Sequence, residues 1–313
     1  MRRLRVGTRG SPLARWQAEA VAGALVSAGA PPVELVLIRT SGDRLSSKPI
    51  SSTGGKRLFV KEIEEALIDG RVDLAVHSAK DLPAERLAGL SVQAVLPRED
   101  ARDAVVAPRS CERPAADPAA LFAPDRAPRV GTGSVRRTAQ LRHAYPHLEV
   151  APIRGNVGTR LDKLETGGFD LLVLAAAGLV RLNLAARIAV RLPFDICVPA
   201  PGQGIVCAEH RCDDGEMRDL LSAIADRDAS AALEAERTLV TALGADCQVP
   251  LGAVTTVAGS DLFLRGVVAS PDGARLVRHE ASGSLAGAAD LGSRVAAGLL
   301  AGGAGPLLEA ART

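Results

Sequence analysis

The chain has few aromatic residues, and this scarcity already excludes one class of partner. Of its 313 residues only 2% are aromatic, namely one Trp, one Tyr and five Phe. Proteins that bind single-stranded nucleic acid without sequence preference stack the bases on aromatic rings. We therefore expect no nucleic-acid partner, although part of the chain is strongly basic.

Long apolar runs are also missing. The most apolar stretch, 171–180, is interrupted by Gly178 and followed by Arg181, so it is too short to span a membrane. The N-terminal sequence MRRLRVGTRGSP has no apolar core of the kind that a signal peptide requires. These features predict a cytoplasmic protein with no membrane partner.

The cysteines have no spacing typical of a metal site. There are five, at positions 111, 197, 207, 212 and 247, and no two of them form a C-x-x-C pair. Such usage suits a reducing compartment and predicts no metal. We expect most of these thiols to be buried and unreactive, and spacing alone does not single out Cys247.

Charge is distributed unevenly, although the formal net charge is only +2. Residues 129–160 contain six arginines and one acid, Glu149. Residues 213–236 contain eight acids and two arginines, and we interpret this run as a solvated helical surface. The length of the chain allows two or three domains with a sizeable core.

The basic segment has the pattern of two successive strand–loop–helix units. Val130 leads into a glycine-rich turn in which Ser134 can cap a helix, and Arg154-Gly155-Asn156 follows the next apolar stretch, with Asn156 as the second cap. Helix N-termini attract anions, and arginines add forked, permanently charged donors. We interpret the segment as one pocket for an anionic ligand, the alternative being a solvated basic face.

The N-terminal part repeats this arrangement. Leu4–Thr8 is predicted to be a strand, Arg9 follows it, and Ser11-Pro12 has the composition of a helix start. Apolar residues then recur at helical spacing, which predicts a face that packs on a sheet, with Trp16 in the core. That face comprises Leu13, Trp16, Ala20, Ala24 and Ala28.

Two further segments indicate a ligand site. Residues 39–56 form a long polar stretch, which we interpret as a loop and, as a hypothesis, a lid. The predicted strand 72–76 runs into HSAKDLP, and ligands of open α/β sheets lie at the carboxyl ends of strands. Lys80 and Asp81 are therefore candidates for chemistry, although Asp81 also suits a turn or cap.

The order of these patterns predicts three domains. Residues 1–100 with 198–215 form one α/β lobe, and 104–194 form a second α/β lobe inserted between its pieces. Two lobes joined in this way close on a ligand like a hinge. Residues 218–313, in which alternating strands precede a helix, predict a small α+β domain.

Eight short motifs together resemble one family. They are TRGSPLA (8–14), GGKRLFVKE (54–62), HSAKDLP (77–83), GTGSVRR (131–137), RGNVGTRL (154–161), AAAGLVRL (175–182), PAPGQG (199–204) and CQVP (247–250). In this order they resemble hydroxymethylbilane synthase, also called porphobilinogen deaminase, over essentially the whole chain. The resemblance implies two lobes like those of periplasmic binding proteins plus a third, α+β domain, and a monomer.

The resemblance also implies a reaction and a cofactor. Four porphobilinogen molecules would be condensed head to tail, with loss of ammonia, into the linear tetrapyrrole hydroxymethylbilane. A dipyrromethane cofactor, attached through a thioether to Cys247, would prime the chain. Asp81 would be the catalytic acid that stabilises the cation left when ammonia departs.

Each pyrrole carries an acetate and a propionate, so the growing chain is a polyanion that cationic residues would hold. The residues that the resemblance places at the cofactor and substrate are Arg9, Ser11, Lys56, Lys61, Lys80, Thr132, Ser134, Arg136, Arg137, Arg154, Arg160 and Arg181. Two positions depart from the commoner pattern: Gly133 replaces a frequent serine, and Ala245-Asp246 replaces two glycines.

Two other classes of function compete with this interpretation. A non-catalytic two-lobed protein could bind a carboxylate ligand, but the third domain with its loop cysteine argues against it. A phosphate- or nucleotide-binding enzyme would also use glycine turns and arginines. The chain contains no G-x-x-x-x-G-K-[ST], and GTGSVR is not a dinucleotide fingerprint.

Overall fold

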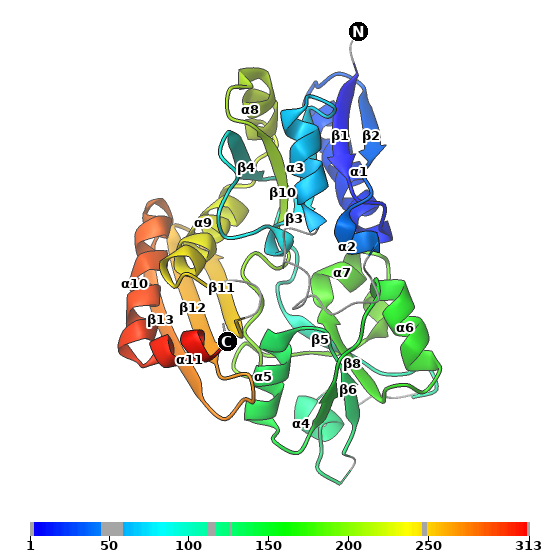
Figure 1. Cartoon of the computed structure of the whole chain (residues 1–313), viewed down its shortest axis with the longest axis vertical. Coiled ribbons are helices and arrows are strands. Elements are labelled where there is room, and N and C mark those ends of the chain that lie inside the picture. Colours follow the sequence, from blue (N-terminus) through cyan, green and yellow to red (C-terminus); the bar gives the residue numbers. More distant parts are fainter. Residues whose placement is uncertain (1–2, 45–58, 112–116, 126, 246–248, 312–313) are drawn as a thin grey trace.

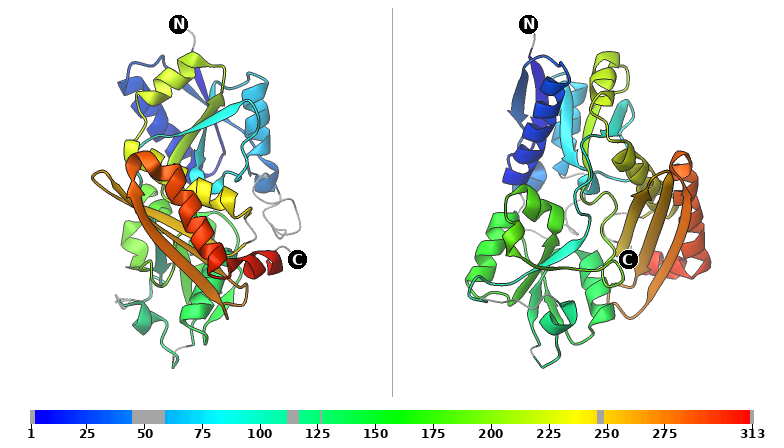
Figure 2. Two further views of the ribbon diagram at one scale, coloured as in Figure 1. Left: turned by 90° about the vertical axis from the view of Figure 1, so that its left-hand side faces the viewer. Right: turned by 180° about the vertical axis from the view of Figure 1, so that it is seen from behind.

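The structure is a computed structural model, and it describes residues 3–44, 59–111, 117–125, 127–245 and 249–311. Two α/β lobes lie one above the other, and a C-terminal domain lies beside their junction (Figures 1 and 2). The predicted fold class, two α/β lobes with a small α+β domain, is confirmed.

Lobe 1 is built on a sheet with the strand order β2-β1-β3-β10-β4. Its strands are β1 (Leu4–Thr8), β2 (Val33–Leu37), β3 (Leu74–Ser78), β4 (Leu90–Ala94) and β10 (Val206–Arg211). Its helices are α1 (Pro12–Ser27), the short α2 (Ser41–Arg44), α3 (Lys61–Ile68) and α8 (Gly215–Ser222). Side chains alternate between the faces: Leu74 and Val76 pack with α1 and α8, whereas Ala75 packs with α3.

Lobe 2 has the strand order β7-β6-β8-β5-β9. Its strands are β5 (Asp103–Val106), β6 (Arg129–Gly131), β7 (Glu149–Ala151), β8 (Leu171–Ala175) and β9 (Ile188–Arg191). Its helices are α4 (Pro118–Leu121), α5 (Val135–Ala144), α6 (Val157–Glu165) and α7 (Ala176–Arg181). Val105 and Val173 face α5, whereas Leu172 and Leu174 face α6 and α7.

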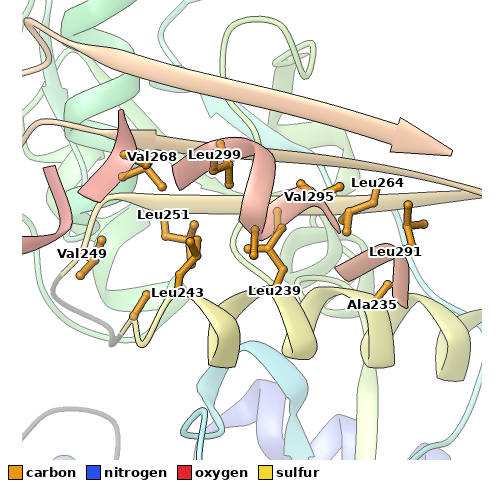
Figure 3. Close-up of a cluster of buried hydrophobic side chains, with 14 of the residues drawn as sticks. Ala235, Leu239, Leu243, Val249, Leu251, Leu264, Val268, Leu291, Val295 and Leu299 are labelled. Atoms are coloured by element: carbon orange, nitrogen blue, oxygen red, sulfur yellow. The ribbon is translucent and has the colours of Figure 1, made fainter. Parts of the chain in front are cut away.

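The C-terminal domain consists of helices packed on an antiparallel sheet. The helices are α9 (Arg227–Ala242), α10 (Ala288–Ala301) and α11 (Ala304–Ala310), and the strands are β11 (Leu251–Ala258), β12 (Asp261–Ala269) and β13 (Leu276–Ser284). Figure 3 shows its core, in which Leu239 of α9 and Val295 of α10 meet Leu264 of β12. Leu243, Ala245 and Val249 belong to the same core, so both sides of residues 246–248 are anchored in it.

Several expectations from the sequence were wrong. The face of α1 that packs on the sheet is Gln17, Ala18, Val21 and Leu25, because the large Val21 and Leu25 outweigh the alanine stripe beside them. The strand predicted at 72–76 begins at Leu74, because the amide of Val72 still hydrogen-bonds the carbonyl of Ala66 at the end of α3.

Two predictions about burial hold only in part. Among the four described cysteines, Cys197 and Cys207 are buried, but Cys111 and Cys212 are exposed. The acidic run 213–236 is not all solvated, because Glu236 is fully buried. Residues 45–56 of the proposed lid lie outside the described part of the chain, and so do Lys56 and Cys247.

Candidate active site

A cavity of about 1070 Å³ lies between the two lobes. Lobe 1 contributes the start of α1 and the segment after β3, and lobe 2 contributes the two turns that open α5 and α6, together with α7. The chain returns from lobe 2 to lobe 1 through residues 192–205, which we call the returning crossover. Residues 203–205 of this crossover also line the cavity. Such a volume suits a ligand larger than a single pyrrole.

The charge of the described lining is almost entirely positive. Its cations are Arg9, Arg39, Lys80, Arg137, Arg154, Arg160, Lys163 and Arg181. Asp81 is the one carboxylate among the described lining residues. The cavity is therefore built for a ligand that carries several negative charges, with a single acid placed among the cations.

Lobe 1 presents its groups where strands end. Ser11 caps α1 by accepting a hydrogen bond from the amide of Ala14, as predicted, and the guanidinium of Arg9 lies 4.4 Å from the centre of the Phe59 ring. Strand β3 passes directly into a short 3₁₀ helix, Ala79–Asp81. This turn brings Lys80 and Asp81 into the cavity.

Lobe 2 presents two capped helix starts side by side. The Ser134 hydroxyl accepts a hydrogen bond from the Arg137 amide, and the Asn156 side chain accepts one from the Thr159 amide at 2.9 Å. Both predicted caps are confirmed. A Cβ atom on Gly133 would lie 2.8 Å from the carbonyl oxygen of Ile153, so glycine allows the two turns to approach each other closely.

The second turn concentrates positive charge. The Arg160 Nε donates to the Gly155 carbonyl at 2.8 Å, and the Lys163 ammonium donates to the Arg154 carbonyl at 3.0 Å. Burial, followed by the neighbouring charges of Arg137 and Arg154, lowers the pKa of Arg160 to about 10. The cluster favours an anion because the guanidinium groups repel one another without one.

Beneath the cavity, Asp103 holds two adjacent arginines. Its fully buried carboxylate lies 2.7 Å from the guanidinium groups of both Arg136 and Arg137. These charges hold the pKa of Asp103 well below its usual range against the effect of burial. Arg137 lines the cavity, whereas Arg136 turns away and donates to the carbonyl of Val198 at 2.6 Å.

Arg181 links lobe 2 to lobe 1. Its guanidinium donates to the carbonyl of Gly204 at 2.7 Å and lies 5.5 Å from the centre of the Trp16 ring. Trp16 is therefore half-buried beneath a cation, and its predicted place in the core was wrong. The ring supports an arginine that lines the cavity.

The structure brings most of the predicted site residues together. Those that line the cavity are Arg9, Ser11, Lys80, Asp81, Arg137, Arg154, Arg160 and Arg181. Thr132, Ser134 and Arg136 lie just behind the lining, where Thr132 accepts a hydrogen bond from the Ser134 amide. Lys61 is exposed on α3 and pairs with Glu65, away from the cavity.

Four residues at or beneath the site were missed from the sequence. Arg39 follows strand β2, so the rule about strand ends could have found it, and Lys163 lies one helical turn beyond Arg160. Asp103 gave no local signal, and nothing in the PAPGQG motif singled out its Gln203, because the importance of both residues depends on partners far away in the chain.

The described part of the chain has neither a cluster of metal-ligating side chains nor a membrane-spanning helix. Its residues contain no group of three or more His, Cys, Asp or Glu side chains that could hold a metal ion. They also contain no helix of sufficient length and apolarity to cross a membrane.

Comparison with known families accounts for both the lobes and the C-terminal domain. Residues 4–219 match the family model described as porphobilinogen deaminase, dipyromethane cofactor binding domain. The chain belongs to the porphobilinogen deaminase family. Residues 231–301 match the model of the same family's C-terminal domain. The predicted function, a transferase acting as hydroxymethylbilane synthase, and the predicted dipyrromethane cofactor are confirmed at the level of the family.

Relatives with this name are similar over nearly their full length. A porphobilinogen deaminase of Acidithiobacillus ferrooxidans is 48% identical over 313 residues, covering 99% of this chain and 98% of the relative. One of Xanthomonas campestris pv. campestris is 46% identical, covering 98% and 99%. One of Syntrophotalea carbinolica is 45% identical, covering 98% and 95%.

Among solved structures, the similar chains are distant. The periplasmic VFT2 domain of Bordetella pertussis BvgS is 17% identical with a TM-score of 0.42, covering 74% of this chain and 91% of that domain. An amino acid ABC transporter substrate-binding protein of Streptococcus pneumoniae is 14% identical with a TM-score of 0.40, covering 75% and 94%.

Proposed function

We propose that this family member condenses four porphobilinogen molecules head to tail in the cavity between its lobes, releasing ammonia and forming hydroxymethylbilane. The observation that carries this placement is the lining itself, in which cations surround the single described carboxylate, Asp81. A polyanionic chain of pyrroles matches such a lining in charge. A plain carboxylate-binding protein would not need the C-terminal domain that the family shares.

The residues of the cavity fit the dipyrromethane cofactor by the chemistry of their donors. Arg137, Arg154 and Arg160 would hold its carboxylates, since forked guanidinium donors match carboxylate oxygens. When bound, the cofactor supplies the primer from which the chain of pyrroles grows. Several similar cationic contacts, rather than one tight pocket, let the growing chain shift while its charges stay neutralised.

Asp81 is the proposed catalytic acid. Loss of ammonia from porphobilinogen leaves a delocalised cation, which a carboxylate fixed at the end of β3 stabilises without having to reorganise. The same carboxylate can move protons to the leaving amine and from the new ring carbon. Lys80, Arg9 and Arg181 hold the substrate's own carboxylates around it.

Replacement of Asp81 tests this role. Asp81→Asn keeps the shape of the side chain but removes its charge, so we expect turnover to fall at least about a hundredfold while folding is preserved. Steady-state kinetics and circular dichroism measure the two effects. The control is Glu85→Gln, which neutralises an exposed acid four residues away. Near-normal turnover of Asp81→Asn would remove this residue from the mechanism.

Cys247 is the proposed attachment site of the cofactor. The purified protein should carry extra mass equal to a dipyrromethane, and Cys247→Ser should abolish it. Cys212→Ser, which changes an exposed cysteine, should retain the extra mass. Intact-mass spectrometry reads out all three proteins, and extra mass that persists in Cys247→Ser would contradict the attachment.

Four further expectations stay predictions. The domain boundaries are 1–100 with 198–215, 104–194 and 218–313, and the chain acts in the cytoplasm without nucleic acid. The chain is also expected to be a monomer, as the family resemblance implies. Light scattering during size-exclusion chromatography measures the molar mass, and a dimer would contradict this inference.

A further inference from the structure

Gln203 lies where the two lobes and their crossover meet. Its side chain is almost completely buried at 1% exposure, although its amide reaches the lining of the cavity. The amide nitrogen donates to the Ala101 carbonyl at 2.7 Å and to the Asp103 carboxylate at 2.8 Å. Because both of these partners are acceptors, the orientation of the amide is fixed.

The oxygen of the same amide points at Lys80. The Lys80 ammonium donates a hydrogen bond to the Gln203 Oε1 at 3.2 Å. Lys80 belongs to lobe 1, whereas Asp103 begins the first strand of lobe 2. A single amide thus connects a lysine of one lobe to the buried carboxylate of the other.

Asp103 is itself held firmly in place in lobe 2. Its carboxylate is held by Arg136 and Arg137, and its position at the start of β5 fixes it to the sheet of lobe 2. Arg137 also approaches the Gln203 Oε1, at 3.5 Å. The amide oxygen therefore lies between an ammonium of lobe 1 and a guanidinium of lobe 2, so it spaces the two cations apart.

We propose that Gln203 is a positioning residue that holds the Lys80 ammonium beside Asp81 and in register with Arg137 across the cavity. This inference rests on the proposed placement of the reaction at Asp81. Gln203 would not react itself; it fixes where a cation meets the substrate.

The electrostatics of Lys80 provide a readout of this role. Burial lowers the pKa of Lys80 to about 8, against the opposing effect of Asp81, and the other charges that face it are Arg137, Asp103 and Arg136. An acceptor on the ammonium favours the charged form. Loss of the Gln203 oxygen therefore lowers the pKa of Lys80 further, so the charge is lost at a lower pH.

Gln140 offers a matched control for a purely structural role. It is another glutamine with 1% exposure, and its amide bonds both the N–H and the carbonyl of Val198, at 2.7 and 3.0 Å, in the same crossover. It does not line the cavity. Gln140→Met removes a buried amide of the same size without touching Lys80.

The experiment measures the pKa of Lys80 in the holoenzyme by competitive acetylation at a series of pH values, with the modified peptide read by mass spectrometry. No substrate is present, so the measurement does not depend on turnover. The pH dependence of kcat/KM is measured on the same proteins. In the original chain we expect the acetylation rate of Lys80 to rise with a midpoint near pH 8. We expect kcat/KM to fall with the same midpoint on its alkaline side.

In Gln203→Met we expect both curves to move to lower pH by roughly one unit, since a hydrogen bond to a charged group is removed. At the pH of the original midpoint and above, kcat/KM then falls by up to about tenfold. Gln203→Asn should also move both curves to lower pH, because its amide is one methylene shorter and its oxygen no longer reaches the ammonium. Gln140→Met should leave both curves unchanged.

Three results would overturn the inference: an unshifted acetylation curve in folded Gln203→Met, an equal shift in Gln140→Met, or an ordinary lysine pKa in the unmodified sequence. If Gln203→Met does not fold, Gln203→Asn decides instead, and an unshifted acetylation curve in that variant overturns the inference. Normal turnover of Asp81→Asn would contradict the proposed function. The acetylation curves are measured without substrate, so they test the role of Gln203 independently of that function.

Discussion

Two adjacent arginines at the start of α5 serve different purposes. Both pair with Asp103, but Arg137 reaches the cavity, whereas Arg136 ties α5 to the crossover through the carbonyl of Val198. The resemblance gave both the same role at the substrate. Their separation follows from the helix, which turns by about 100° per residue, so that neighbours face different surroundings.

Replacement of Arg160 tests whether the positively charged turn at the start of α6 binds the substrate. The Arg160 guanidinium lies near the positive charges of Arg137 and Arg154, so we expect it to contribute to binding an anion. We expect Arg160→Gln to lower kcat/KM by roughly 10- to 100-fold, the loss of a hydrogen bond to a charged group, without lowering the melting temperature.

Arg129→Gln is the control for that variant. Arg129 belongs to the same basic segment, but its side chain is half-exposed and pairs with Glu149 outside the cavity. Its kinetics should stay unchanged. Equal losses in the two variants would mean that the net charge of the segment, rather than the position of Arg160, governs binding.

At the scale of elements, the starts of three helices organise the cavity. Ser11, Ser134 and Asn156 each cap a helix whose first residues contribute to the lining or support it. The caps satisfy amide groups that would otherwise lack partners, and they fix the direction in which the following side chains point.

The cap of α5 gives a prediction about stability. Ser134→Ala removes the hydroxyl that accepts the Arg137 amide, so we expect a loss of about 1 kcal/mol in the free energy of unfolding. Thermal or urea denaturation measures it.

The matched change is Ser293→Ala, in the exposed middle of α10, where the hydroxyl bonds only the carbonyl of Ala289. The free energy of unfolding of Ser293→Ala should differ from that of the original chain by no more than about 0.5 kcal/mol. An equally small effect of Ser134→Ala would show that water or the fold replaces the cap.

At the scale of the whole molecule, one buried ion pair joins the three parts. Glu236 of α9 pairs with Arg98 at 2.6 Å and accepts hydrogen bonds from the amides of Gly202 and Thr255. Arg98 precedes lobe 2, Gly202 lies in the returning crossover, and Thr255 belongs to β11. The C-terminal domain is thus attached to both segments that connect the lobes.

Neutralising Glu236 should loosen this junction. Glu236→Gln leaves Arg98 without its counter-ion, so we expect a loss of about 3–5 kcal/mol in the free energy of unfolding. Denaturant midpoints measure the change. The control is Glu234→Gln, on the exposed side of α9, which should be nearly neutral. A small effect at Glu236 would mean that the junction is held by packing instead.

The fold and the core of the site were largely predictable from local patterns. Turn residues with capping side chains located α1, α5 and α6, and the charge of residues 129–160 indicated an anion site. The helix starts were predicted correctly because capping depends on residues close together in the chain. The anion site stays a prediction. The orientation of α1 was wrong because a stripe of alanines carries little weight against a few larger side chains.

The sequence by itself determined the family, the order of the elements and the cluster of cations that predicts an anionic ligand. Only the tertiary structure decided which cations face the cavity, that Arg136 and Arg137 pair with Asp103, and that Gln203 joins Lys80 to the opposite lobe. Lys80 and Gln203 lie 123 residues apart in the chain, and Arg98 and Glu236 lie 138 apart. Contacts at such separations arise when whole elements pack, so no local pattern records them.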